Sequence, residues 1–291
     1  MNHPESGLFS RGDMVLRSAN TVEGDAHYWS SGNFRIEKLD KSLGNLFSPN
    51  DPIIRVSGDV NFDNYRGTSL HILAGGSVNI GTITITGADL TGNTINPIST
   101  PTLANVTLSN GTPLVINGTT QPTLDIRAGT TAFGTPGISG TNFTTLSPRP
   151  NTTAPVTGAN ITINDIDVLA PNGLVFLTNQ YQSNTSLSGL IKLGAINLRS
   201  DTGDSGSVII DSRSNITISP GFISTRSVVG NSGDITLIAK DTILLGNNAY
   251  IGSGTVGANS KNLGNISITA GSLVLNAGTF LESLVYFSEN L

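Results

Sequence analysis

The sequence predicts an all-β chain whose short strands stack as the rungs of a parallel β-helix, a solenoid. Three observations predict it. One pattern occurs three times, its apolar residues alternate with the strand period of two, and Gly, Asn and Pro stand at the corners. Because one rung cannot bury its inner face alone, the predicted core is the stack itself.

The repeat is clearest toward the C-terminal end, where the copies begin at Gly206, Gly233 and Gly264. Each copy reads glycine, polar, apolar, any, apolar, any, small. A second apolar alternation, a turn of small residues and a third apolar pair such as Phe222-Ile223 follow. Small residues supply the backbone angles that corners need, so each copy describes one coil of three strands. About ten such rungs would make a rod about 50 Å long at ~4.8 Å per strand.

The composition favours strands and excludes several classes of protein. Glu is absent between Lys38 and Leu281, which argues against long surface helices. The net charge of −5 is dispersed, so no nucleic-acid partner is expected. The apolar runs fall short of the ~18 residues of a membrane helix, so no membrane span is expected. Residues 1–20 lack the apolar core of a signal peptide, and no signal peptide is expected in this chain.

The pattern divides the chain into three parts. Residues 1–52 are predicted to be a leading segment, with an irregular excursion over residues 21–50 packed on the stack. Residues 53–283 are predicted to form the parallel β-helix, with a proline-rich loop protruding near residues 130–158. Residues 284–291 read as an atypical tail. Because neither end reads as a polar cap, we expect a piece of a longer protein or a shortened one.

Three stretches carry a resemblance to a known family: residues 31–40, residues 46–55 and residues 70–80. Across most of residues 8–283 the chain closely resembles an internal region of filamentous-haemagglutinin-like exoproteins, particularly cyanobacterial ones. The resemblance implies a right-handed β-helix. It also implies export of the full-length parent by two-partner secretion, through a dedicated outer-membrane transporter. The Asn-Pro-Asn-Gly hallmark of the secretion domain has only a faint echo, at Ala170-Pro-Asn-Gly173.

The expected function is a structural and adhesive segment of a secreted or cell-surface exoprotein. Its rungs would present Thr, Asn and Ser outward, and loops such as residues 130–158 would bind partners. The partners expected are the outer-membrane two-partner-secretion transporter and, in addition, surface glycans or receptors of host or neighbouring cells. No catalytic, cofactor-binding or metal-binding residue is predicted, and no cofactor. A polysaccharide-active β-helix enzyme (lyase or hydrolase) and a truncated non-functional fragment stay open as alternatives.

One tripeptide, Arg11-Gly12-Asp13, matches a cell-adhesion motif. Gly-Asp also recurs where other rungs open, at Gly58-Asp59, Gly203-Asp204 and Gly233-Asp234. Three-residue matches arise often by chance, so an ordinary rung opening is the favoured interpretation.

Two acidic pairs are the best candidates for an enzyme. Asp165 and Asp167 would share one face of a strand, but no Lys or Arg lies within 15 positions of Asp165. Asp201 and Asp204 follow Arg199 and look like turn residues. Acid–base catalysis needs converging groups, so neither pair favours an enzyme.

The remaining candidates for a binding site are the histidines and the tryptophan. His3, His27 and His71 are too scattered to predict a metal site, and the alternation around His71 predicts an exposed strand position. Trp29 with Tyr28 would suit a glycan-stacking platform, although a packed anchor is the favoured interpretation.

Overall fold

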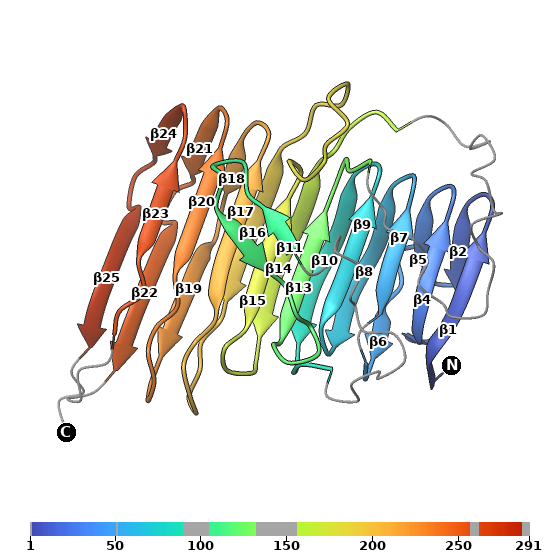
Figure 1. Cartoon of the computed structure of the whole chain (residues 1–291), viewed down its shortest axis with the longest axis horizontal. Coiled ribbons are helices and arrows are strands. Elements are labelled where there is room, and N and C mark those ends of the chain that lie inside the picture. The colour runs from blue at the N-terminus through green and yellow to red at the C-terminus, as the bar shows by residue number, and fades with distance from the viewer. Residues whose placement is uncertain (1, 51, 90–104, 132–155, 257–261, 287–291) are drawn as a thin grey trace.

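The computed structural model describes residues 2–50, 52–89, 105–131, 156–256 and 262–286 (Figure 1). These residues form 25 strands and contain no helix, so the all-β class is confirmed. Residues 132–155 of the expected protruding loop and residues 287–291 of the expected tail lie outside the described residues.

Nine strands form the first sheet, and every neighbouring pair in it is parallel. In Figure 1 these strands stand side by side along the long axis of the molecule, from the N-terminal to the C-terminal end. Their order in space is their order in sequence: β1 (Asn2–Ser10), β4 (Asp25–Ser30), β7 (Ile53–Val56), β9 (Leu70–Ala74), β13 (Thr123–Arg127), β15 (Leu174–Thr178), β17 (Ser207–Ser212), β20 (Ile235–Ala239) and β23 (Ile266–Thr269).

Fourteen strands form the second sheet, which is also parallel throughout. Its main path is β2 (Met14–Arg17), β5 (Phe34–Glu37), β8 (Val60–Gly67), β10 (Val78–Ile85), β14 (Ile161–Val168), β16 (Ile191–Asn197), β18 (Ile216–Ile218), β21 (Thr242–Leu245) and β24 (Ser272–Leu275). Five further strands extend it beside this path: β3 (Val22–Glu23), β6 (Leu46–Ser48), β19 (Phe222–Ser227), β22 (Tyr250–Val256) and β25 (Phe280–Tyr286).

In the two large sheets, each strand pairs with a strand of the preceding or following repeat rather than with its neighbour in sequence. Val208 of β17 lies opposite Ile235 of β20, which lies opposite Ile266 of β23. The hydrogen bond from the backbone N–H of Asp234 to Ser207 Oγ spans 27 positions, and that from the backbone N–H of Asn265 to Asp234 Oδ1 spans 31. These are the spacings of the repeat in the sequence. The period-two alternation therefore sends one set of aliphatic side chains inward, and these form a single core along both sheets.

The glycines that open the repeat copies stack on one another. A Cβ atom on Gly233 would clash with the carbonyl oxygen of Gly206, and one on Gly264 would clash with that of Gly233. The backbone of each repeat copy approaches that of the next too closely for a side chain at this position, which explains why the repeat begins with glycine.

The segment expected as an excursion, residues 21–50, contributes strands to both sheets. β4 joins the first sheet, and β3, β5 and β6 join the second. β6 pairs with β3 on one side and with β8 on the other, so this segment widens the second sheet toward the N-terminal end.

The outer faces of the two sheets differ. The second sheet faces solvent with polar and charged side chains, among them Thr84, Asp165 and Lys192. The outer face of the first sheet is covered in part, because the antiparallel hairpin of β11 (Asn105–Thr107) and β12 (Pro113–Val115) packs over β15, β17 and β20 (Figure 1). A second apolar cluster joins the hairpin region to this outer face: Val106, Leu108, Ile116, Leu174, Phe176 and Ile238.

Candidate functional site

A row of outward side chains crosses the second sheet at right angles to its strands. Glu23 of β3 lies opposite Phe47 of β6, which lies opposite Arg66 of β8. The row continues through Thr84 of β10 and Asp167 of β14. Neighbouring strands stand about 4.8 Å apart, so these side chains are presented at that spacing.

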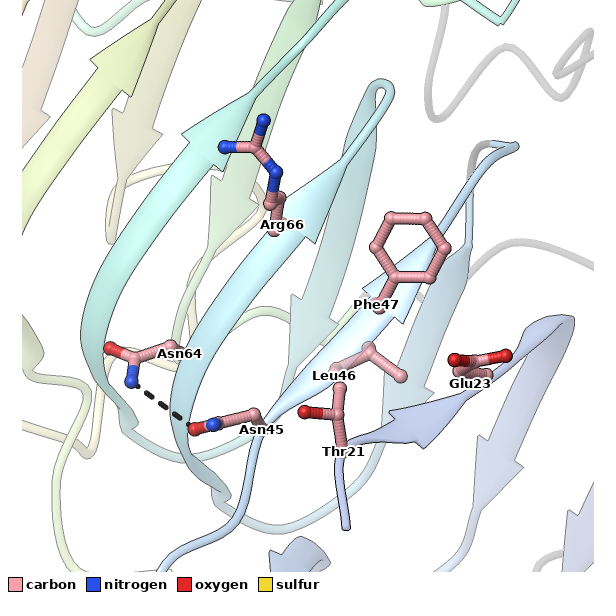
Figure 2. A pocket seen from close by; sticks show the side chains of 7 residues that line it. All are labelled: Thr21, Glu23, Asn45, Leu46, Phe47, Asn64 and Arg66. Carbon is pink, nitrogen blue, oxygen red and sulfur yellow. Dashed lines mark hydrogen bonds between the residues drawn. The ribbon is translucent and has the colours of Figure 1, made fainter.

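The N-terminal end of this row borders a groove of about 420 Å³, which we call the Phe47 groove. Figure 2 shows the Phe47 ring between the side chains of Arg66 and Glu23. Phe47 is 37% exposed, although Leu46 before it and Ser48 after it are buried. The strand alternation therefore turns one aromatic ring out into solvent. The groove is lined by Thr21, Glu23, Asn45, Leu46, Phe47, Asn64 and Arg66.

Two amides at one end of the groove are fixed by hydrogen bonds. Asn64 Nδ2 donates to Asn45 Oδ1 at 3.2 Å, drawn in Figure 2, and Asn64 Oδ1 accepts from the backbone N–H of Thr82 at 3.1 Å. Arg66 is exposed, and within the described part of the chain its guanidinium makes no hydrogen bond or ion pair. The groove therefore offers an apolar ring, one cation, one carboxylate and oriented amides, which suits a polar ligand with an apolar face.

The Arg11-Gly12-Asp13 tripeptide lies at a corner between the sheets. Asp13 Oδ1 accepts from the backbone N–H of Asn33 at 2.7 Å, and Asn33 Oδ1 accepts from that of Asp59 at 2.8 Å. Asp59 Oδ1 in turn accepts from the backbone N–H of Ser77 at 2.7 Å. A side-chain oxygen of one coil thus satisfies an amide of the next. This is the structural role that the rung-opening interpretation of Gly-Asp predicts.

The two acidic pairs have different surroundings. Asp165 and Asp167 share the outer face of β14, where Asp167 Oδ1 accepts from Asn197 Nδ2 at 3.3 Å. Asp201 forms an exposed ion pair with Arg199 at 2.8 Å. Asp204 has a different partner, because its Oδ1 accepts from the backbone N–H of Asn231 at 2.8 Å in another corner ladder.

The expectation that His71 is exposed was wrong. His71 has no solvent exposure, because it belongs to the covered outer face of the first sheet. His3 lies in β1, and His27 lies on the same outer face as His71. Burial, the positive charge of Arg55 and the nearby His71 lower the pKa of His27 to about 4. Among the described residues, no group of three His, Cys, Asp or Glu side chains could hold a metal ion.

His71 forms a buried charged cluster with Asp125 and Arg127 on β13. His71 Nδ1 lies 3.2 Å from Asp125 Oδ2, while Arg127 Nε and Nη2 donate to the two carboxylate oxygens at 2.9 and 2.8 Å. Burial opposes ionisation of Asp125, but the Arg127 charge and the hydrogen bonds from His71 and Arg127 hold its pKa below the ordinary value. The Arg127 Cζ atom also lies 4.4 Å from the ring centroid of Tyr181.

Sequence reasoning missed this cluster, although a signal was present. The stretches 69–74 and 123–128 share one pattern, and aligning them sets His71 opposite Asp125. A histidine and a carboxylate at aligned outward positions of two repeats predict a cross-strand hydrogen-bonded pair.

Tyr28 and Trp29 point to opposite faces of the first sheet. Tyr28 is 1% exposed in the core, with its ring centroid 5.3 Å from that of Phe34. Trp29 faces outward, and the Arg55 Cζ atom lies 5.9 Å from its ring centroid. The two rings form no shared platform, and Tyr28 is a packed anchor.

Comparison with known proteins gives no relative. No protein-family model, curated protein or solved structure matches this chain. The described residues contain no helix that is long and apolar enough to cross a membrane.

Proposed function

We propose that the chain is a structural and adhesive rod, a segment of a secreted or cell-surface exoprotein of the filamentous-haemagglutinin-like kind. The parent would be exported by two-partner secretion through its outer-membrane transporter. In this proposal the two sheets are walls of one parallel β-helix, whose right hand is the one that the resemblance implies.

The observation that carries the proposal is the uninterrupted parallel pairing of strands from successive coils. The first sheet adds one strand per coil from β1 to β23, in sequence order and always parallel. Backbone hydrogen bonds between coils run along the long axis, and one continuous aliphatic core lies inside them. Such an arrangement is stiff along its axis and can hold a binding surface away from a cell.

The outer face of the second sheet supports an adhesive role. It exposes polar and charged side chains, and it carries the open Phe47 groove toward its N-terminal end. Surface glycans or receptors of host or neighbouring cells would bind there. The loop near residues 130–158, the other expected contact region, lies mostly outside the described residues.

Protease treatment of intact cells tests this function. The complete gene that encodes these residues would carry an epitope tag next to them and would be expressed with its outer-membrane transporter. We expect the epitope to be removed by protease added outside the cells, and surface exposure to be lost when the transporter gene is deleted. Full protection of the epitope in cells that express the transporter would contradict the proposal.

Incubation of the purified chain with anionic polysaccharides tests the alternative that the chain is a polysaccharide-active enzyme. A passive rod releases neither unsaturated nor reducing ends. Release of such ends in proportion to the protein concentration would replace the structural function with a catalytic one.

A further inference from the structure

Phe47 is an exposed aromatic ring whose neighbours frame it without covering it. Glu23 and Arg66, which flank it on the adjacent strands, are both exposed. A pyranose sugar has an apolar face of C–H groups and an edge of hydroxyls. An aromatic ring with charged residues on both sides complements both features of such a sugar.

The opposite charges on the two sides of the ring determine which way an anionic ligand would lie in the groove. The Arg66 guanidinium has a planar fork that binds a carboxylate through two parallel N–H···O bonds. Glu23 lies on the opposite side of Phe47, where its carboxylate would repel an anion and accept hydrogen bonds from hydroxyls. A sugar with one carboxylate would therefore lie with that group toward Arg66.

The Asn45 and Asn64 amides supply hydrogen bonds in fixed positions. Because Asn64 is held at both ends, by Asn45 and by the backbone N–H of Thr82, little side-chain entropy remains to be lost on binding. The volume of about 420 Å³ is near the lower end of the range of roughly 300–1,000 Å³ for small-molecule sites. The groove therefore suits a short piece of a saccharide chain.

We propose that the Phe47 groove binds an anionic saccharide, with a sugar ring stacked on Phe47 and a uronate carboxylate paired with Arg66. This inference rests on the proposed adhesive function and names the ligand class for it. Neutral saccharides would stack on the same ring but would lack the ion pair.

Titration of the full 291-residue chain tests the site. The probes are an oligogalacturonate, a neutral oligosaccharide of the same length and a polyglutamate peptide of the same charge, each followed by calorimetry. We expect the oligogalacturonate to bind about 10-fold more tightly than either other probe, because only it offers both a stacking face and a carboxylate. Its affinity should fall as the salt concentration rises.

Variants locate the binding. Phe47→Ala and Arg66→Gln should each weaken oligogalacturonate binding by about 10-fold, and Arg66→Gln should abolish the preference over the neutral probe. Arg66→Lys keeps the charge without the fork and should be intermediate. Phe222→Ala, at a ring 38% exposed on β19, and Arg199→Gln, at a guanidinium outside the groove, are matched controls that should bind normally. Thermal unfolding of each variant checks that it is folded.

Three results would overturn the saccharide site: equal affinity for the neutral probe, no effect of Phe47→Ala and Arg66→Gln, or binding of the peptide alone. None of them bears on exposure to protease on intact cells. A chain that is surface-exposed but fails to bind oligogalacturonate keeps the proposed function and loses this site. A chain that binds oligogalacturonate but is protected inside cells keeps the site and loses the function.

Discussion

His71 on β9 lies directly opposite Asp125 on β13, 54 positions later in the chain, and neither side chain is exposed to solvent. The pair sits on the outer face of the first sheet, where a rod would be expected to show polar groups to water. The loop around Gly118 contacts it, because a Cβ on Gly118 would meet His71 Nε2. Ser69 Oγ donates to the Gly118 carbonyl at 2.7 Å. The loop therefore covers His71, and the hydroxyl of Ser69 binds the loop to the sheet.

Removing the buried carboxylate should destabilise the chain strongly. Asp125→Ala leaves Arg127 and His71 buried without their anion, and loss of one partner of a buried pair costs about 3–5 kcal/mol. Urea unfolding followed by circular dichroism measures the loss. Asp201→Ala is the matched control, because its exposed pair with Arg199 should contribute less than about 1 kcal/mol. Equal losses in the two variants would contradict the role of the cluster.

The stability of the chain should fall in mild acid because of His27. Its pKa is about 4 in the folded chain, lowered by burial and then by Arg55 and His71, against about 6.5 when unfolded. Between these values only the unfolded state binds the proton. Stability from this residue is therefore complete above about pH 6.5 and declines, by about 3 kcal/mol in all, toward pH 4.

Urea unfolding at several pH values between 4 and 7 checks the sign. His27→Gln removes the titrating group, so the variant should show a flatter pH dependence than the parent chain. If the free energy of unfolding changed with pH equally in both proteins, His27 would not be the cause of the pH dependence.

Amide exchange in the hairpin should become faster when the hydrogen bonds that join the hairpin to the first sheet are removed. Asp211 accepts from Ser109 twice, from its backbone N–H at 2.8 Å and from its hydroxyl at 2.6 Å. Each hydrogen bond to a charged group contributes about 1.5–3 kcal/mol, so Asp211→Ala should speed amide exchange of residues 105–115 by about 10-fold or more. Hydrogen exchange with mass spectrometry measures it. Asp241→Ala, at an exposed turn, should leave that segment unchanged.

The stacked glycines should not tolerate a methyl group. Gly233→Ala sets a Cβ against the Gly206 carbonyl, and such overpacking costs about 1–3 kcal/mol. Gly87→Ala is the control, because nothing lies within 4 Å of a Cβ there. Thermal unfolding compares the two. A Gly233→Ala chain as stable as the Gly87→Ala chain would mean that the coils can separate at this corner without loss.

The local pattern was sufficient to predict the class and the stacking. Apolar residues at alternate positions, as in Val208 and Ile210, point to one face of a strand whatever lies around them. A repeat that opens on glycine fixes which residues of successive copies meet, so the sequence pattern aligns Gly206, Gly233 and Gly264 as the structure does. These features depend only on neighbours in sequence and on the spacing of the repeat.

The candidate site could not be predicted in this way. Glu23, Phe47 and Arg66 belong to strands at unequal spacings, in a stretch without the repeat, so no local pattern fixes their register.

The sequence alone therefore determined an all-β chain of parallel strands with one inward aliphatic face, because strand periodicity is local. The tertiary structure decided which outer face is covered. The hairpin packs over β15, β17 and β20 of the first sheet and helps to bury Phe176, while the second sheet exposes Phe47. Burial of an outward side chain depends on which distant segment packs over it, and an alternating pattern carries no information about that.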